Sequence, residues 1–310
     1  RLLDKQRSEL ARSPGELPLV RAIAEKVLRL SGLRYDPLEE VTVFSGCTEA
    51  IFCALLGLVE PGDEVVLFEP YYDSYRACVA MAGATPVFVT LHAPEFRWRA
   101  EELERAFTPR TRVVLLNTPH NPTGRVLRRE ELEQVAALAR RFGVYVVADE
   151  VYEHLVFAGE HVPIATLPGM RERTVTLSST GKTFSLTGWK IGYSTAPAEL
   201  TAALRTVHQF VTFAVATPLQ HAMVEALAAT GAYYRDFLAE YAARRARLLA
   251  LLENAGLQAI SPEGTYFACV DVRSAGFDDD VAFCRHLIEK VGVRRSRCRP
   301  FTSTRRKAGA

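Results

Sequence analysis

Between residues 41 and 197, short apolar runs alternate with segments that have the periodicity of helices. Five of the runs have the length of strands: 64–68, 86–90, 112–116, 144–148 and 174–178. Strands that are apolar along their whole length are buried on both faces, as in a mostly parallel sheet that helices cover on both sides. The sequence therefore predicts an α/β fold, in which ligands bind at the carboxyl ends of the strands.

After residue 197 the pattern becomes helical, with apolar periodicity over residues 202–213, 219–229 and 233–255. The last of these segments predicts a long helix that leads into a second domain. In that domain, residues 265–272 have the pattern of a strand, and residues 278–291 that of an amphipathic helix with aspartate at its start. A chain of 310 residues, 48% of them hydrophobic, is long enough for one large and one smaller domain.

The composition predicts a cytoplasmic enzyme that binds neither a metal nor a membrane. No apolar run approaches the roughly 20 residues of a membrane span, and the basic start of the chain lacks the apolar stretch of a secretory signal. The six cysteines are scattered, without a CxxC pair or the spacing of metal ligands. Reduced thiols of a cytoplasmic protein are therefore expected rather than disulfides or a metal site.

Three polar motifs lie where predicted strands end. Residues 117–124 follow one strand, Asp149 ends the next, and residues 179–182 follow a third. Together they offer what pyridoxal phosphate needs: an amine for its aldehyde, a carboxylate for its ring nitrogen and hydrogen-bond donors for its oxygen atoms. Taken singly, Lys182 is also compatible with a solvated charge, and Asp149 with a helix cap or a salt bridge. The prediction rests on the order and joint presence of the motifs.

Further side chains fit the same cofactor. Tyr152 and Asn121 could donate to the phenolic oxygen, and Tyr72 could stack on the ring. Each has an ordinary alternative, since Asn-Pro-Thr-Gly is a common turn and aromatic residues often serve core packing. The assignment of these three residues to the cofactor site rests on the motifs around them.

Residues 45–51 resemble the start of a helix at a glycine-bearing loop, where free backbone N–H groups would receive a phosphate with help from Ser179 and Lys190. The triplet that starts at Gly181 also matches the end of a nucleotide-binding P-loop. That motif needs a glycine five positions earlier, where this chain has Thr176, so a P-loop is excluded. No G-x-G-x-x-G follows a strand, so a nicotinamide dehydrogenase gains no support.

These residues resemble those of the class I and II aminotransferases, pyridoxal phosphate enzymes of fold type I, and most closely the branch with kynurenine, glutamine and methionine aminotransferases. The resemblance runs from about residue 15 to residue 293. It is carried by motifs at residues 43–50, 68–75, 117–124, 148–154, 179–193 and 262–267.

The resemblance implies a large domain with a mostly parallel seven-stranded sheet covered by helices, plus a smaller α+β domain that is incomplete here. On this basis residues 1–34 are the truncated N-terminal part of the small domain or arm. Residues 35–245 are the large domain that binds the cofactor, and residues 246–310 are the truncated C-terminal small domain with an aberrant tail at 294–310. The family also implies a homodimer, with no nucleic acid partner.

The resemblance further implies pyridoxal 5'-phosphate as cofactor, with Lys182 as the catalytic Schiff-base lysine that also moves the α-proton. The residues implied to bind the cofactor are Gly46, Cys47, Thr48, Tyr72, Asn121, Asp149, Tyr152, Ser179, Lys182 and Lys190. The implied reaction is ping-pong transfer of an amino group from an amino acid to a 2-oxo acid. The implied donors are methionine, glutamine, and aromatic or kynurenine-like amino acids.

Three features depart from the family pattern. The chain starts after the family segment whose glycine touches the substrate carboxylate, and Leu10 stands where the family has a tyrosine that reaches the partner subunit's phosphate. The family's C-terminal arginine, which clamps the substrate α-carboxylate, would lie beyond residue 310. We therefore expect this form to bind the cofactor but to transaminate poorly.

The tail at residues 294–310 holds seven of the 38 basic residues and no acid, which leaves 31 basic against 36 acidic residues, a net charge of −5, in the rest of the chain. Such a tail could bind nucleic acid. However, GC-rich codons for this segment, read one base earlier, can spell a sequence that the family places after residue 293. We interpret the tail as the product of a frameshift.

Two other functions share the cofactor residues. A carbon–sulfur β-lyase on the same fold would release pyruvate and ammonia after removal of the α-proton. A non-catalytic remnant or regulatory module would bind the cofactor without turnover. Transfer of the amino group to a 2-oxo acid distinguishes the aminotransferase from both.

Overall fold

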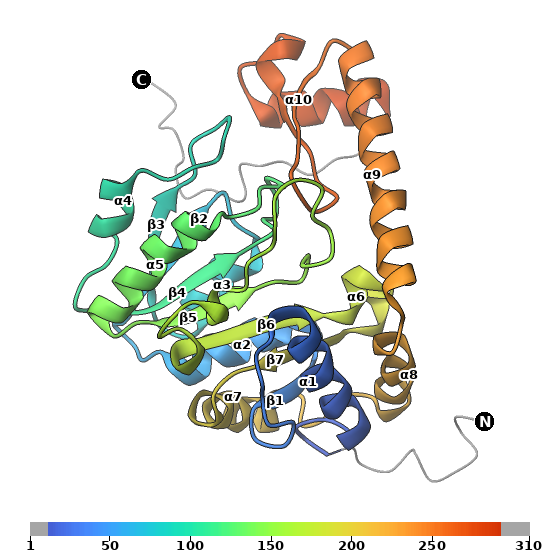
Figure 1. The fold of residues 1–310 in the computed structure, drawn as a ribbon. Coiled ribbons are helices and arrows are strands. Elements are labelled where there is room, and N and C mark those ends of the chain that lie inside the picture. Colours follow the sequence, from blue (N-terminus) through green and yellow to red (C-terminus); the bar gives the residue numbers. More distant parts are fainter. Residues whose placement is uncertain (1–11, 293–310) are drawn as a thin grey trace.

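The computed structural model describes residues 12–292, and a seven-stranded sheet lies at its centre (Figure 1). The strand order is β1-β7-β6-β5-β4-β2-β3. The strands are β1 (Val41–Ser45), β2 (Glu64–Glu69), β3 (Thr85–Thr90), β4 (Thr111–Asn117), β5 (Tyr145–Asp149), β6 (Thr174–Ser179) and β7 (Ile191–Thr195). Neighbouring strands are parallel, except that β7 runs antiparallel to β1 and to β6. The mostly parallel seven-stranded sheet is thus confirmed.

The five apolar runs form β2 to β6 within one residue of their predicted limits. Strands β2, β4, β5 and β6 are largely buried on both faces, whereas β3 lies at the edge of the sheet and is mostly part-exposed. Successive side chains of a strand point to opposite faces. In β4, Val113 and Leu115 therefore pack in one core cluster, whereas Val114 and Leu116 pack in another. The sheet accordingly separates two cores, each covered by its own helices.

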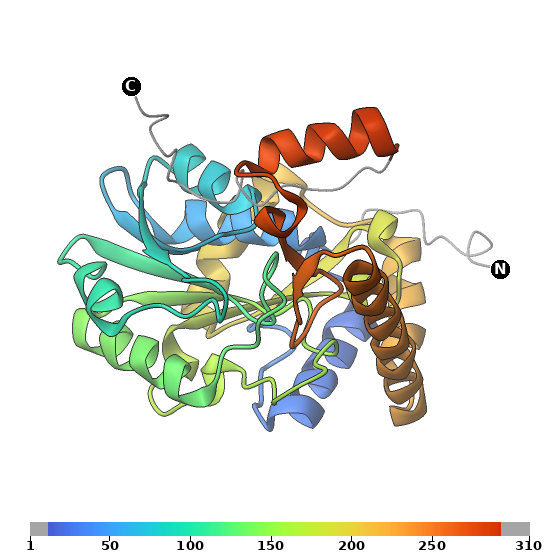
Figure 2. The ribbon, with the colours of Figure 1, turned by 90° about the horizontal axis from the view of Figure 1, so that it is seen from above.

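The first core contains residues of α2 (Gly46–Leu58), α3 (Ser74–Met81) and α7 (Ala198–Val211). The second contains residues of α4 (Ala100–Arg105) and α5 (Arg129–Phe142). A third cluster joins α1 (Leu17–Ser31) and α8 (Thr217–Leu227) to β1 and β7. Helices thus cover both faces of the sheet, as Figure 2 shows from above.

Helix α9 (Gly231–Asn254) leads away from the sheet to a smaller group of elements (Figure 1). There β8 (Gln258–Ile260) pairs antiparallel with β9 (Cys269–Asp271), and α10 (Asp280–His286) follows, continued by a π-helical turn over Leu287–Val291. The Asp279 side chain caps α10 by accepting from the backbone N–H of Val281 at 2.8 Å. Because α9 continues across residues 245 and 246, the division into domains at that point stays a prediction.

The strand predicted over residues 265–272 is much shorter in the structure. Thr265 has a φ of +62°, and its backbone N–H donates to Leu155 O at 2.9 Å instead of to β8. Residues 265–268 are thereby drawn toward the sheet, next to the cavity described below. The predictions about Leu10 and about the tail at 294–310 lie outside the described residues.

Between residues 12 and 292, none of the helices combines the length and the apolar character that crossing a membrane requires.

Candidate active site

A cavity of roughly 700 Å³, including its open mouth, lies at the carboxyl edge of the sheet. Strands β2, β4, β5 and β6 are parallel, so the segments that follow them meet at this edge. The structure brings all ten side chains or backbone positions predicted from the sequence to the lining of this cavity: Gly46, Cys47, Thr48, Tyr72, Asn121, Asp149, Tyr152, Ser179, Lys182 and Lys190.

The start of α2 forms an anion cradle on one side of the cavity. Gly46 has a φ of +79°, and a Cβ at this position would lie 2.9 Å from Lys190 Nζ. A Cβ on Gly192 would lie 2.4 Å from the backbone nitrogen of Cys47. Only glycine therefore allows β7 and the lysine to approach the first turn of α2. Free N–H groups of that turn and the nearby ammonium together favour an anion such as phosphate.

Ser179 closes the cradle from the neighbouring strand. Its Oγ accepts from the backbone N–H of Gly181 at 3.0 Å, which caps the short helix α6 (Thr180–Thr183) that carries Lys182. The same hydroxyl lies 3.3 Å from Ile191 O, to which it donates. Ser179 thus ties the segment with Lys182 to the strand that follows Lys190.

Asp149 ends β5 and is buried, with 4% of its surface exposed. The Tyr75 hydroxyl donates to its Oδ2 at 2.7 Å, and the backbone N–H of Val151 donates to its Oδ1 at 3.3 Å. The Cys47 thiol lies 3.8 Å from the same Oδ1. Burial raises the pKa of Asp149 to about 6, although these hydrogen bonds act in the opposite direction. Since these donors are neutral, the carboxylate is suited to a cation that enters the cavity.

The Lys182 amine lies between aromatic side chains. Its Nζ donates to the Tyr266 hydroxyl at 2.9 Å, and the Tyr152 hydroxyl donates to the same oxygen at 3.3 Å. The amine also lies 5.6 Å and 5.5 Å from the centroids of the Tyr152 and Tyr266 rings. Burial, with Tyr266 nearby, raises the pKa of Tyr152, so its hydroxyl keeps its proton and can act as a donor.

Sequence reasoning missed three residues of this site. Tyr75 holds Asp149, and Tyr266 holds Lys182. Asn117 supports the base of the cavity, because its Nδ2 donates to Asp149 O at 2.9 Å and its Oδ1 accepts from the backbone N–H of Asn121 at 2.7 Å. All three lie inside the motifs quoted above. The polar groups of Asn117 and Tyr75, at or shortly after strand ends, were a usable signal, but the partners of all three residues depend on the fold.

Comparison with known proteins gives consistent matches over most of the chain. A family model described as aminotransferase class I and II matches residues 2–308. A probable N-succinyldiaminopimelate aminotransferase, DapC, of Mycobacterium tuberculosis is 49% identical over 284 residues, which cover 90% of this chain and 71% of that protein. Kynurenine–oxoglutarate transaminase 3 of mouse is 41% identical over 289 residues, covering 87% of this chain and 64% of that protein.

A solved structure of an aminotransferase also matches this chain. YbdL from Escherichia coli, described as having a methionine aminotransferase function, matches with a TM-score of 0.93 and 38% sequence identity. The match covers 97% of this chain and 80% of that one.

Proposed function

The chain belongs to the aminotransferase class I and II family and is an aminotransferase, and we propose that it works with pyridoxal phosphate held in the cavity around Lys182. This is the family that the sequence motifs resemble, so that identification is confirmed, as is the fold class. The observation that carries the proposal is the joint position of an amine, a buried carboxylate and a helix N-terminus around one cavity.

The residues present fit this cofactor. The backbone of Gly46, Cys47 and Thr48, with Ser179 and Lys190, would hold the phosphate at the cradle. Asp149 offers a buried carboxylate to a protonated ring nitrogen, which would supply the cation that its neutral donors do not.

Other lining side chains fit the remaining groups of the cofactor. Asn121 and Tyr152 would donate to the phenolic oxygen, and Tyr72 would lie against the ring. When bound, the cofactor supplies an aldehyde for an amine and a ring that accepts electrons from the substrate.

The side chains of this chain then have separable tasks. Asp149 keeps a positive charge at the far end of the cavity, and Tyr75 and Val151 fix the direction of its carboxylate. The Lys182 amine is the base that takes the α-proton of the substrate. It then donates the same proton as an acid, so one amine serves both steps. Tyr266 holds the Lys182 amine at the mouth of the cavity, where an incoming amino acid meets it.

The substrates we propose are an amino acid donor and a 2-oxo acid acceptor. Tyr266 and Phe267 have ring centroids 4.7 Å apart, and the Tyr241 ring lies 6.2 Å from Tyr266. This aromatic surface beside Lys182 supports donors with bulky or apolar side chains: methionine, glutamine, and aromatic or kynurenine-like amino acids. N-succinyldiaminopimelate belongs beside them in any test, since the relative with 49% identity is named for it.

The experiment is a spectral titration followed by single turnovers. Pyridoxal phosphate added to the purified chain should give an absorbance band at about 420 nm, which reports its linkage to a lysine. Each donor should then bleach the band, and a 2-oxo acid should restore it. A cysteine S-conjugate, whose sulfur can leave from Cβ, tests the alternative: release of a thiol, pyruvate and ammonia in place of transfer would identify a β-lyase. A wild-type chain without the band would refute the proposal.

A homodimer and a cytoplasmic location are further parts of the proposal. Phe210, Val211 and Phe213, at and just after the end of α7, are 81%, 48% and 40% exposed, which supports an interface there. Cys47, Cys53 and Cys78 are thiols in the described part of the chain, which supports a reducing compartment. Light scattering tests the assembly, because a dimer has twice the 34.4 kDa of one chain and a single-chain mass contradicts it.

A further inference from the structure

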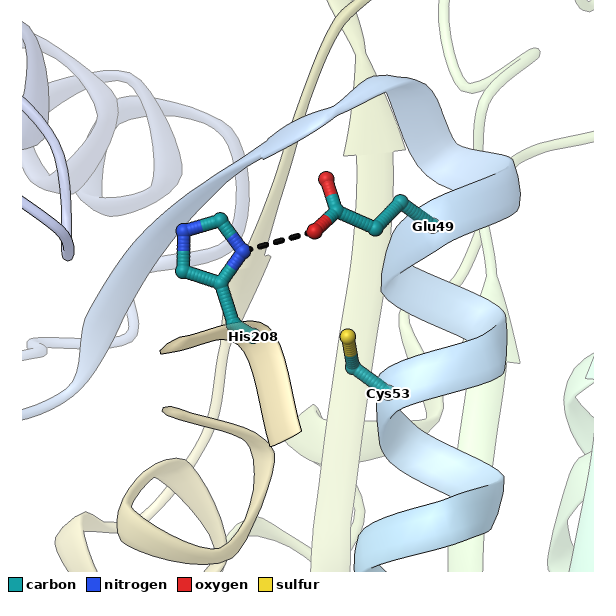
Figure 3. Close-up of side chains that lie close together, drawn as sticks. All are labelled: Glu49, Cys53 and His208. Carbon is teal, nitrogen blue, oxygen red and sulfur yellow. Dashed lines mark hydrogen bonds and ion pairs between the residues drawn. The ribbon is translucent and has the colours of Figure 1, made fainter. Parts of the chain in front are cut away.

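Glu49, Cys53 and His208 form a buried cluster behind the anion cradle (Figure 3). Glu49 and Cys53 lie one turn apart on α2, and His208 lies in the last turn of α7. Their ligand atoms lie within 4.8 Å of one another, which is close enough for a shared metal ion to be considered. The hydrogen bonds of the cluster decide whether that is its role.

Glu49 and His208 are already fully engaged. The His208 ring faces Glu49 Oε1 across 2.7 Å from Nδ1 and donates from Nε2 to Ser13 O at 2.9 Å. Glu49 Oε2 accepts from the backbone N–H of Ser45. Burial, with the Glu49 carboxylate nearby, raises the pKa of Cys53 to about 12, so in the absence of a metal ion it remains a thiol. The cluster is therefore a hydrogen-bonded pair beside a packed thiol.

The pair carries no net charge. Ser13 O can only accept, so Nε2 of His208 carries a proton, and Nδ1 shares a second proton with the Glu49 carboxyl group. This matters because Glu49 lies in the first turn of α2, whose free N–H groups face the cavity. An unneutralised carboxylate there would repel an anion through a medium of low dielectric constant. His208 removes that repulsion.

Glu49 also fixes the geometry of the turn. Its carboxyl group reaches back from the fourth residue of α2 to the N–H of Ser45, the residue that precedes the helix. The Ser45 side chain makes no cap, so it does not occupy the first N–H groups of α2, while Glu49 accepts from the N–H of Ser45 itself. The turn at Gly46, whose residues line the cavity, is thereby held in place.

We propose that Glu49 and His208 are a positioning pair for the phosphate group of the cofactor. Glu49 orients the turn that binds the phosphate, and His208 cancels the charge that this support would otherwise bring. The inference rests on the proposed function, because the phosphate belongs to the cofactor proposed above.

The test separates phosphate recognition from the rest of the cofactor. Apoprotein is titrated with pyridoxal phosphate, with pyridoxal and with inorganic phosphate. His208→Gln leaves the Glu49 charge without its partner. We expect this variant to bind pyridoxal phosphate and inorganic phosphate roughly tenfold more weakly than wild type, with its affinity for pyridoxal almost unchanged. Adding Glu49→Gln to that variant should restore most of the loss, because the amide is neutral but still accepts from the Ser45 N–H.

One control variant and three possible outcomes make the test decisive. Cys53→Ala removes a side chain of the same cluster without touching the pair, and it should leave the ratio of pyridoxal phosphate to pyridoxal affinity unchanged. Equal weakening of both aldehydes in His208→Gln, or no rescue in the double variant, would mean that the pair serves only packing. Stoichiometric Zn²⁺ binding that Cys53→Ala and Glu49→Gln both abolish would also overturn it, in favour of a metal site.

The proposed function and this inference fail in different ways. A wild-type chain that forms no absorbance band with either aldehyde contradicts the proposed function. The inorganic phosphate titration still tests the pair in that case, because it needs no lysine chemistry. Equal phosphate affinity in the wild type and in His208→Gln would refute the inference.

Discussion

Replacement of Asp149 by asparagine should stabilise the protein without cofactor and weaken its hold on pyridoxal phosphate. Burial raises the pKa of Asp149 from 3.8 to about 6. Keeping this group ionised at neutral pH therefore costs about 3 kcal/mol of folding free energy. Asparagine removes that cost and retains an oxygen for the Val151 N–H, while the Tyr75 hydroxyl can turn to accept from the new amide.

The pH dependence follows from the same shift. The folded protein holds a proton on Asp149 more tightly than the unfolded chain does, so this group contributes stability below pH 4 that is lost as the pH rises through about 6. The advantage of Asp149→Asn should accordingly be largest at pH 7.5, at up to about 3 kcal/mol, and roughly half as large at pH 5.

Cofactor affinity should move in the opposite direction. A protonated ring nitrogen left without its carboxylate partner loses about 2 to 5 kcal/mol, so the Kd for pyridoxal phosphate should rise at least about 30-fold. Urea unfolding of both apoproteins at pH 5 and pH 7.5, together with spectral titration at pH 7.5, measures both effects. A variant that is no more stable than wild type at pH 7.5 and binds the cofactor equally well would refute the reasoning.

Three other substitutions test other parts of the structure. Lys182→Ala should abolish the band at about 420 nm and all transamination, while circular dichroism shows an unchanged fold, because the lysine supplies chemistry and little core. Tyr266→Phe removes the hydrogen bond to the Lys182 amine, so single-turnover rates should fall by roughly tenfold with little change in cofactor Kd. Lys26 forms a buried ion pair with Glu153. Lys26→Met should therefore cost about 3 to 5 kcal/mol of stability, measured by urea unfolding, because it leaves the Glu153 carboxylate buried without this partner. Adding Glu153→Gln should recover much of that loss, and no recovery would exclude the buried charge as the cause.

Most of the central sheet was predictable from the sequence because β2, β4, β5 and β6 are largely buried on both faces. An apolar run such as residues 112–116 carries its own signal, and the structure extends it by one residue at each end to Thr111–Asn117. The sequence pattern did not predict the direction of β7. Its antiparallel pairing with β1 and β6 is set by the short connection from β6 through α6, which does not allow a parallel crossover.

The candidate site was predictable at the level of residue types and less so at the level of partners. Lys182 and Asp149 could be chosen because their chemistry suits one cofactor and both follow strands. The hydrogen bond from Tyr75 to Asp149 joins residues 74 positions apart, and the pair of Glu49 and His208 joins residues 159 apart. Such contacts depend on how α3 and α7 pack on the sheet, which no local pattern specifies.

Two residues of the site have an environment or a conformation that costs stability in the protein without cofactor. Asp149 is a carboxylate buried among neutral donors, and Lys190 adopts a φ of +53°, which is unfavourable for a residue with a Cβ. A ligand that brings a cation to Asp149 and an anion to Lys190 compensates the charge of the buried carboxylate and that of the ammonium group. Pyridoxal phosphate at a fixed concentration, 100 times its Kd at pH 7.5, should raise the free energy of unfolding at that pH by about 2.7 kcal/mol, as for any ligand of the folded state. This gain should shrink at pH 5, where Asp149 is largely protonated, and a gain that is the same at pH 5 and pH 7.5 would show that Asp149 does not meet the ring nitrogen.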